Sequence, residues 1–349
     1  MRLPCGTINK SYEQDMAIVR TKLQWLVLVI ALLLLFSFPL WGPPRFVSLM
    51  ITMGVTIIGT LGLTLLTGYA GQISLGHMAF VAVGAYTVGI LMSDLSFPFW
   101  AALPCAGVVS GFIGLIFGLP SLRVRGFYLV IATLAAQFII MHVIIHLPGL
   151  TGGTAGLHIP YIKIGDFAFK SDLSYYLLTM VFVVICILLA KNMARTKVGR
   201  AWIAIRDNDL SAEVMGVSLF SYKLLAFFVG CFFAGIAGAL WAPYLRTILP
   251  ETFTLMGSVW YLGYIIVGGM GSIMGPICGV VFITLLGEFT GDLVTALATN
   301  FPALGGFVTA SGYLVFGLVI ILFLIFEPRG IAHRWGLIKA SYRLWPFSQ

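Results

Sequence analysis

The residue types that could do chemistry are sparse in this sequence, and two pairs of them at the ends of apolar runs stand one helical turn apart. His142 and His146 have a spacing that can hold a metal ion, but no third ligand accompanies them. Glu288 and Asp292 stand near the expected outer end of an apolar run, so we interpret them as interfacial rather than as part of an ion path. We therefore expect no catalytic residue and no metal site.

The motifs that would supply an active site are also missing. The sequence has no GxxxxGK[ST] loop for nucleotide phosphates, no HExxH and no GxSxG. Its five cysteines show no paired spacing and are interpreted as small buried hydrophobes. We expect no cofactor and no enzymatic activity, so the energy for any uphill transport must come from another chain.

The amino-acid composition indicates the class of protein to which these few polar groups belong. Of the 349 residues, 60% are hydrophobic and 9% are charged, against about 25% charged in soluble domains. A soluble protein is thereby excluded. The net charge of +8 comes without a dense basic stretch, which excludes nucleic acid as a partner.

Ten apolar runs are long enough to be considered as membrane spans, which need about 20 helical residues for a hydrocarbon core of about 30 Å. They are Leu23–Leu40, Phe46–Thr67, His77–Met92, Phe99–Gly118, Gly126–Leu147, Leu173–Ala190, Lys223–Leu245, Thr254–Gly268, Ser272–Thr290 and Gly305–Phe326. The third and eighth are short and suit broken or re-entrant segments. The sequence predicts an all-α polytopic membrane protein with eight to ten transmembrane helices, and no cleavage site follows the first run.

Basic residues fall mainly on one side of this scheme. With a cytoplasmic N-terminus, 16 of the 20 Lys and Arg residues lie inside, and only Arg45, Lys163, Lys170 and Arg246 lie outside. We therefore predict a cytoplasmic N-terminal tail at 1–22, a transmembrane domain at 23–326 and a cytoplasmic tail at 327–349. That last tail has a basic amphipathic pattern suited to the anionic inner surface of a lipid membrane or to a partner subunit.

The inner segment at 191–222 is the one stretch typical of a soluble interaction element. A helical spacing places Trp202 and Ile205 on one face, Asn208 and Asp209 suit a helix N-cap, and Gly216 suits a helix C-terminal stop. A short helix pair, apolar on one side, fits a groove on a partner; the alternative is a helix lying on lipid.

Two glycine-dense turns resemble one another, at Gly68–Gly76 and Gly268–Gly275, with an offset of 200 residues. This echo suggests an internal repeat, which many transporters contain. Other small residues recur within the spans, and we interpret them as contacts that let helix backbones approach closely.

Five motifs, in order, resemble a known family over about residues 45–330. They are Gly68–Gly76, Leu122–Leu129, Thr151–Leu157, Gly199–Asp207 with its continuation at Ala212–Gly216, and Phe233–Gly238. Together they are similar to the permease subunits of high-affinity branched-chain amino acid ABC transporters. The central Thr-Gly-Gly loop and the length resemble the M-type subunit more than its H-type partner. Urea-transporting relatives share most of these motifs.

The resemblance implies an inner-membrane subunit of a bacterial importer for leucine, isoleucine or valine. Its implied partners are a second homologous permease, two cytoplasmic ATP-binding subunits and a periplasmic substrate-binding protein, working by alternating access. The 191–222 segment would be the loop that docks on the ATPase subunits. Its implied coupling residues are Trp202, Ile205, Asp209, Ala212, Glu213 and Gly216.

The substrate path is less specified by the sequence. Gln137 stands near the middle of its span with Thr133 one turn earlier, while Gln72 and Ser74 stand in a glycine turn whose backbone must line a cavity or pack on protein. These four are the pathway candidates, with hydrogen bonding between helices as the alternative. Because ionisable groups are nearly absent from the interior of the spans, a secondary transporter is disfavoured; a channel needing no ATPase is a further alternative.

Overall fold

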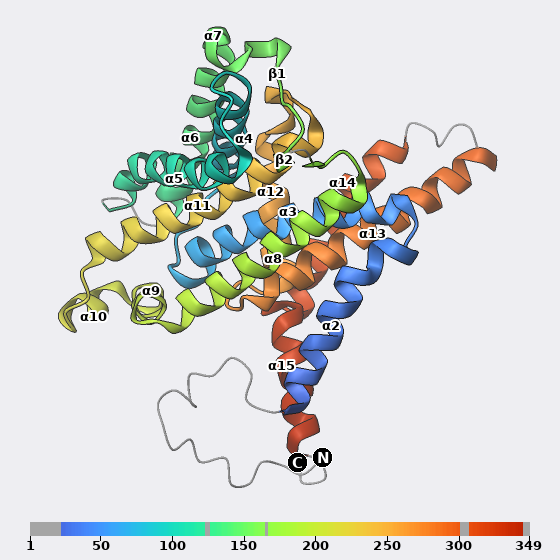
Figure 1. Cartoon of the computed structure of the whole chain (residues 1–349). Helices are drawn as coiled ribbons and strands as arrows, with labels where there is room; N and C mark the ends of the chain where they lie inside the picture. Colours follow the sequence, from blue (N-terminus) through green and yellow to red (C-terminus); the bar gives the residue numbers. More distant parts are fainter. Residues whose placement is uncertain (1–21, 123–125, 165–166, 301–306, 345–349) are drawn as a thin grey trace.

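The computed structural model describes residues 22–122, 126–164, 167–300 and 307–344, which form a helical bundle with two small strand pairs (Figure 1). Nearly all of the predicted N-terminal tail lies outside these residues. The principal helices are α2 Lys22–Trp41, α3 Pro44–Leu63, α4 His77–Ser93, α5 Phe99–Gly118, α6 Phe127–His146, α8 Asp172–Arg195, α9 Lys197–Asp207, α10 Asp209–Val214, α11 Leu219–Leu245, α12 Leu255–Gly268, α13 Met274–Asn300, α14 Phe307–Phe326 and α15 Gly330–Leu344. Shorter elements are the π-helix η1 Thr64–Tyr69, the 3-10 helices η2 Leu119–Leu122, η3 Gly153–Ala155 and η4 Pro250–Thr252, and α7 Pro148–Thr151.

Each of the ten predicted apolar runs overlaps one helix, which confirms an all-α polytopic membrane protein. Among the described residues, six helices are long and apolar enough to cross a membrane, and a bent pair, Ser311–Phe326 with Gly330–Lys339 at 46°, would make a seventh span. Two shorter apolar helices, Trp25–Trp41 and His77–Ser93, stand apart from that group. The predicted count of eight to ten spans stays a prediction.

Helix α11 forms the centre of the bundle and packs against α3, α4 and α5 (Figure 1). Glycines make this close approach possible: a Cβ on Gly62 would collide with the carbonyl oxygen of Gly230, and one on Gly84 with that of Gly235. The interpretation of the small residues as packing contacts is confirmed at these positions.

The start of α4 lies deep inside the bundle. The imidazole Nε2 of its first residue, His77, lies 2.9 Å from the carbonyl oxygen of Gly59. Gly59 itself lies ten residues before Tyr69, where the continuous α3–η1 helix ends. Ten helical residues span about 15 Å. After η1 the chain turns back through residues 70–76, the return segment, which contains no helix or strand, and α4 then begins.

The 14-residue helix α12 begins at a similar depth. Gln137, in the middle of the 20-residue helix α6, contacts both Ala79 at the start of α4 and Phe253 just before α12. Both spans that the sequence marks as short therefore begin after a break in the α-helical backbone, at residues 70–76 before α4 and at η4 with residues 253–254 before α12.

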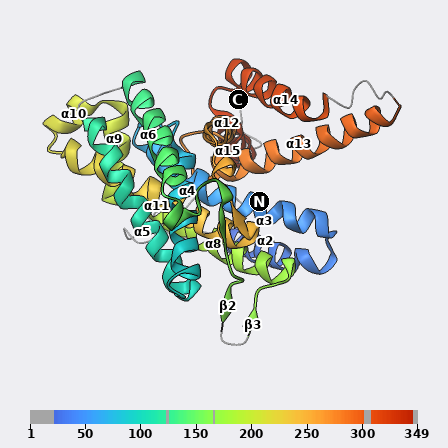
Figure 2. The ribbon, with the colours of Figure 1, turned by 90° about the horizontal axis from the view of Figure 1, so that it is seen from above.

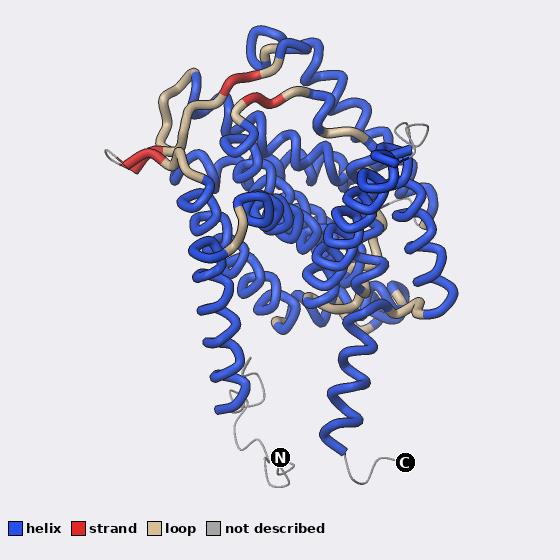
Figure 3. Tube along the Cα trace, turned by 90° about the vertical axis from the view of Figure 1, so that its right-hand side faces the viewer, coloured by secondary structure: helices blue, strands red, loops and turns tan. Residues whose placement is uncertain are grey.

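The two ends of the bundle differ in character. One carries α7 and two antiparallel strand pairs, β1 Leu157–His158 with β4 Thr247–Ile248 and β2 Lys163–Ile164 with β3 Phe167–Ala168; the β2–β3 hairpin projects beyond the helices (Figure 2). The other end carries α9, α10 and α15 (Figure 1). The helices next to the two termini also extend from one common end (Figure 3).

The two glycine turns that echo one another lie in contact. A Cβ on Gly68 would collide with the carbonyl oxygen of Met270. The second turn also packs on the start of α15, since Gly269 approaches Arg329 and Gly330. The internal repeat itself stays a prediction, but its two proposed copies meet at the end of the bundle that carries α9.

Candidate functional site

The segment at 191–222 folds locally as its sequence predicts. The Asn208 side chain caps α10 by accepting a hydrogen bond from the Ser211 backbone N–H at 3.0 Å. Gly216 follows the helix with φ of +85°, a conformation that favours glycine, and its N–H donates to the Glu213 carbonyl at 2.9 Å. The predicted N-cap and C-terminal stop are both confirmed.

The apolar face of α9 is turned into the protein. Trp202 is fully buried and its indole N–H donates to the Tyr222 carbonyl oxygen at 2.8 Å. Ile205 and Ala212 are also buried. The face that the sequence assigned to a partner's groove therefore anchors this segment to its own chain, because a periodicity identifies an apolar face without saying what covers it.

The surface left for a partner belongs mainly to α10. Val214 is 87% exposed and Met215 84% exposed, and Leu210 is exposed beside them. Glu213 and Gly216 are also exposed. Asp209 is different, since its Oδ2 lies 3.6 Å from the ammonium nitrogen of the buried Lys223 on α11. Of the predicted coupling residues, three anchor the element, one ties it to α11, and two stand on its surface.

Arg206 connects α9 to the glycine turns and was missed by the sequence analysis. Its Nη1 donates to the carbonyl oxygen of Gly68 at 2.8 Å. Its Cγ lies close enough to Gly71 that a Cβ there would approach to 2.9 Å, and Gly71 has φ of +70°. The only signal in the sequence was a basic residue in an amphipathic helix, which is ordinarily a solvated position.

Two of the pathway candidates hold the return segment in place. The Thr133 hydroxyl oxygen accepts from the Leu75 backbone N–H at 3.1 Å. The Gln137 amide oxygen accepts from the Ala79 backbone N–H at 2.8 Å, and its amide nitrogen donates to the Phe253 carbonyl at 2.9 Å. These contacts satisfy backbone groups at membrane depth where water is scarce.

The other two candidates have no such partners. Gln72 is 3% exposed and Ser74 is fully buried. Neither the amide atoms of Gln72 nor the hydroxyl of Ser74 has a hydrogen-bond partner among the described residues. The structure thus brings the four candidates to one region, the return segment against the middle of α6, but divides them into bonded and unbonded pairs.

Two further polar residues belong to this region. The Ser258 hydroxyl on α12 accepts from the Met78 backbone N–H at 2.9 Å and lies 3.4 Å from the Gln137 amide oxygen. His77 is fully buried, and its Nδ1 has no partner among the described residues. His77, the first residue of the predicted apolar run His77–Met92, is thus an ionisable side chain in the interior of the bundle that the sequence did not single out.

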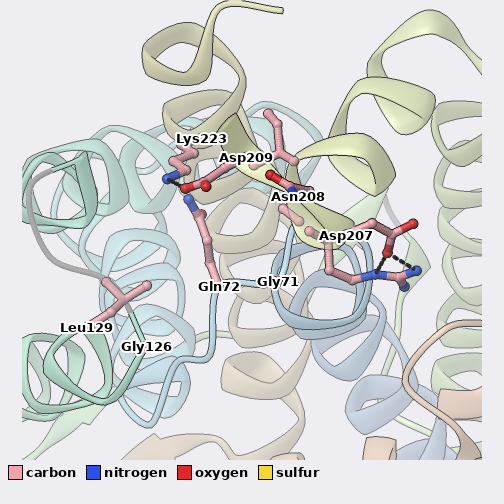
Figure 4. Close-up of a pocket in the computed structure, with 11 residues that line it drawn as sticks. Gly71, Gln72, Gly126, Leu129, Asp207, Asn208, Asp209 and Lys223 are labelled. Carbon is pink, nitrogen blue, oxygen red and sulfur yellow. Dashed lines mark hydrogen bonds and ion pairs between the residues drawn. The ribbon is translucent and has the colours of Figure 1, made fainter. Parts of the chain in front are cut away.

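A cavity of about 390 Å³ lies beside Gln72, where the return segment meets α6, α9, α10 and α11 (Figure 4). It is lined by Ala70, Gly71, Gln72, Gly126, Leu129, Ile205, Arg206, Asp207, Asn208, Asp209 and Lys223. It therefore joins the candidate coupling element to the candidate pathway.

The pairs with helical spacing lie at the opposite end of the bundle. Arg45 donates to Glu288 at 2.6 Å and to Asp292 at 2.7 Å, so the two carboxylates share one exposed cation. The rings of His142 and His146 stack at 3.9 Å. Among the described residues no group of three or more His, Cys, Asp or Glu side chains is placed to hold a metal ion.

The C-terminal pattern forms a helix, as predicted, in α15. Trp335 is 66% exposed and Ile338 is 58% exposed, while Arg334 pairs with Glu327 at the helix start. Trp345, the last residue of the predicted pattern, lies outside the described residues.

A multi-pass helical bundle in which two helices begin after interior breaks, with polar groups gathered at the breaks, is typical of membrane transport proteins. Residues 45–324 match the sequence profile of the branched-chain amino acid transport system permease component. The chain belongs to this family.

Individual relatives agree with that assignment. The chain is 31% identical over 304 residues to the high-affinity branched-chain amino acid transport system permease protein LivM of Salmonella typhimurium, covering 80% of this chain and 68% of the relative. It is 29% identical over 332 residues to LivM of Escherichia coli, covering 88% and 75%. A probable LivM of Methanocaldococcus jannaschii is 24% identical over 327 residues, covering 81% and 92%. No solved structure matches the chain.

Proposed function

We propose that this chain is a transmembrane subunit of an ATP-driven importer for leucine, isoleucine and valine in the bacterial inner membrane. The observation that carries the proposal is its membership of the branched-chain amino acid permease family over residues 45–324. Its proposed partners are a second homologous permease, two cytoplasmic ATP-binding subunits and a periplasmic substrate-binding protein.

The proposed orientation has the N-terminus in the cytoplasm. It places α9, α10 and α15 on the cytoplasmic side and the strand pairs on the periplasmic side, in agreement with the 16 of 20 basic residues assigned to inner segments. The tails at 1–22 and 327–349 are then both cytoplasmic, and α15 rests on anionic lipid or on an ATPase subunit.

Coupling is proposed to run through the docking element formed by α9 and α10. An ATPase subunit would grip the exposed α10 surface around Glu213, Met215 and Gly216. A displacement of α9 would then move the Gly68 turn through the hydrogen bond from Arg206. A displacement of α10 would move Lys223 on α11 through its ion pair with Asp209. Because a packed core has discrete arrangements, such a movement can shift the chain between inward-open and outward-open states.

The proposed path passes the breaks before α4 and α12. There the Gln137 amide oxygen accepts from the Ala79 N–H at the start of α4, and the amide nitrogen donates to the Phe253 carbonyl before α12. Helix N-termini favour anionic groups and unwound carbonyls favour cations, so the same positions suit the carboxylate and ammonium of an amino acid. Gln72, Ser74, Thr133 and Gln137 are proposed to border this path.

Uptake in cells tests the cargo and the energy source together. Radiolabelled leucine and urea are supplied in competition to cells with and without this chain, with and without collapse of the membrane potential. We expect loss of the chain to abolish leucine uptake that survives the collapse. Loss of urea uptake alone would identify urea as the cargo instead of leucine. Uptake that disappears when the membrane potential is collapsed would indicate a secondary transporter.

Copurification tests the docking element. Glu213→Arg and Met215→Asp should abolish association with the ATPase subunits while leaving the chain inserted in the membrane, because both side chains are exposed. Lys170→Asp, at the opposite end of the bundle, is the matched control. Normal association and transport in both α10 variants would refute this docking surface. Gly216→Trp should act similarly, with added strain from its positive φ.

A further inference from the structure

The cavity beside Gln72 has the chemistry of a ligand site. It lies between the return segment, the start of α6, the docking element and α11, and measures about 390 Å³. Gln137 and its partners Ala79 and Phe253, at the middle of the bundle, are not among the residues that line this cavity. The cavity is thus separate from the contacts of Gln137.

The Gln72 amide is the strongest sign of a missing partner. The residue is 3% exposed, yet neither its amide nitrogen nor its amide oxygen is bonded within the described residues. Its side chain points from the return segment toward Lys223 and Asp209 (Figure 4). Buried polar groups are nearly always hydrogen-bonded, so a donor and an acceptor left open together indicate a ligand that supplies both.

The charged groups of the cavity carry both signs. Lys223 and Asp209 face each other at 3.6 Å, longer than the roughly 2.7–2.9 Å of a tight charge-assisted hydrogen bond. Arg206 and Asp207 line the same cavity and pair with each other at 2.9 Å. A simple anion or a simple cation would meet one group of its own sign here, whereas a zwitterion can face each charge with its opposite.

The remaining wall of the cavity is apolar. Leu129 on α6 is 4% exposed and Ile205 on α9 is 5% exposed, and both line the cavity with Gly126. A ligand that places its charged head at Gln72 and Lys223 therefore has an apolar surface available for an uncharged side chain.

We propose that this cavity binds a free apolar α-amino acid from the α10 side of the membrane. Its carboxylate would accept from Lys223 and the Gln72 amide N–H, its ammonium would donate to Asp209, and its side chain would pack on Leu129 and Ile205. The inference rests on the proposed function, since it makes the cavity the place that the cargo occupies on leaving the path.

Direct binding tests the site without the delivery protein. The complex of this chain with its homologous permease and ATPase subunits is placed in nanodiscs of phosphatidylcholine and phosphatidylglycerol, and radiolabelled leucine is titrated. We expect saturable binding. Leucinamide lacks the carboxylate and 4-methylpentanoate lacks the ammonium, so each should compete at least about tenfold more weakly than leucine.

Two variants locate the binding to this cavity. Gln72→Leu removes the open amide and should weaken leucine binding about tenfold. Leu129→Trp fills the apolar part of the cavity with a larger side chain and should block leucine binding. It is an independent test should the Gln72→Leu complex fail to assemble. Lys170→Met, at the other end of the bundle, should bind leucine as the unaltered chain does.

The possible failures separate this inference from the proposed function. A complex that transports leucine but does not bind it here, or binds it unchanged in both variants, overturns the inference alone. Loss of leucine binding when phosphatidylethanolamine is added to the nanodiscs would assign the cavity to a zwitterionic lipid head and also overturn it. Binding and transport of urea without leucine would instead overturn the proposed function.

Discussion

Two glutamine side chains in this permease are buried almost equally, at 3% exposure for Gln72 and 2% for Gln137, but are bonded in opposite ways. The Gln137 amide oxygen accepts from Ala79 and lies within reach of Ser258, and its nitrogen donates to Phe253. The Gln72 amide has no partner among the described residues. Residue type and burial are alike, so only the surrounding backbone distinguishes a structural contact from an open binding group.

The positions of the two residues in the fold explain the contrast. Gln137 lies on a continuous helix opposite the start of α4, where backbone N–H groups need acceptors, and opposite the Phe253 carbonyl just before α12, which needs a donor. Gln72 lies on the return segment itself and projects into a cavity. One glutamine therefore holds the broken spans together, while the other is available for a ligand.

Gln137→Leu should have the largest effect on stability. It removes three hydrogen bonds from the interior, each worth about 1 kcal/mol, so we expect a loss of about 2–4 kcal/mol and a fall of several degrees in the unfolding midpoint. Labelling of the buried Cys186 and Cys231 by a thiol-reactive dye on heating measures this, once the other three cysteines, Cys5, Cys105 and Cys278, are replaced by Ser. An unchanged midpoint would show that Gln137 does not clamp the helix starts.

Thr133→Val should destabilise less. The valine keeps the shape of the side chain but removes the acceptor for the Leu75 N–H, which costs about 1 kcal/mol. The same thermal labelling assay applies, with Thr87→Val on α4 as control because that hydroxyl bonds only its own helix at Val83. A fall no larger than in the control would remove Thr133 from the contacts that hold the return segment.

Arg206→Met should have a small effect on stability and a larger one on function. It removes the bond to Gly68 and a partly exposed ion pair with the neighbouring Asp207, together worth about 1 kcal/mol. It should also lower the leucine transported per ATP hydrolysed, because α9 no longer grips the turn that carries Gln72. Arg206→Lys should retain part of this coupling, and Lys197→Met, on the exposed side of α9, should retain all of it. Full coupling in Arg206→Met would exclude a role for this contact.

Gln72→Leu should leave the unfolding midpoint unchanged or slightly raised. No hydrogen bond is lost, and burial of an unpaired amide is itself unfavourable. A fall comparable to that of Gln137→Leu, in the thermal labelling assay, would erase the contrast between the two glutamines.

The helices were largely predictable from the sequence because each is a local apolar run with polar or glycine boundaries. The predicted span Phe99–Gly118 coincides with α5. The cap at Asn208 and the stop at Gly216 were also predictable, since both depend on neighbouring backbone groups.

Contacts between distant segments were not predictable in this way. The depth of the α4 start depends on Gly59, Gln137 and Ser258, which belong to three other helices. Trp202 belongs to a recognisable apolar face, but its burial depends on the position of Tyr222. Likewise, the cavity at Gln72 draws its walls from four separated segments, and no spacing along the chain reports such a meeting.

The most direct test of ATP-driven import is leucine accumulation in proteoliposomes that contain the full complex and its substrate-binding protein. ATP is supplied only on the side that carries α10, and vesicles without ATP receive an imposed proton or sodium gradient instead. We predict accumulation with ATP and none with either gradient. Accumulation driven by a gradient without ATP would contradict the assignment of this chain to an ATP-driven importer.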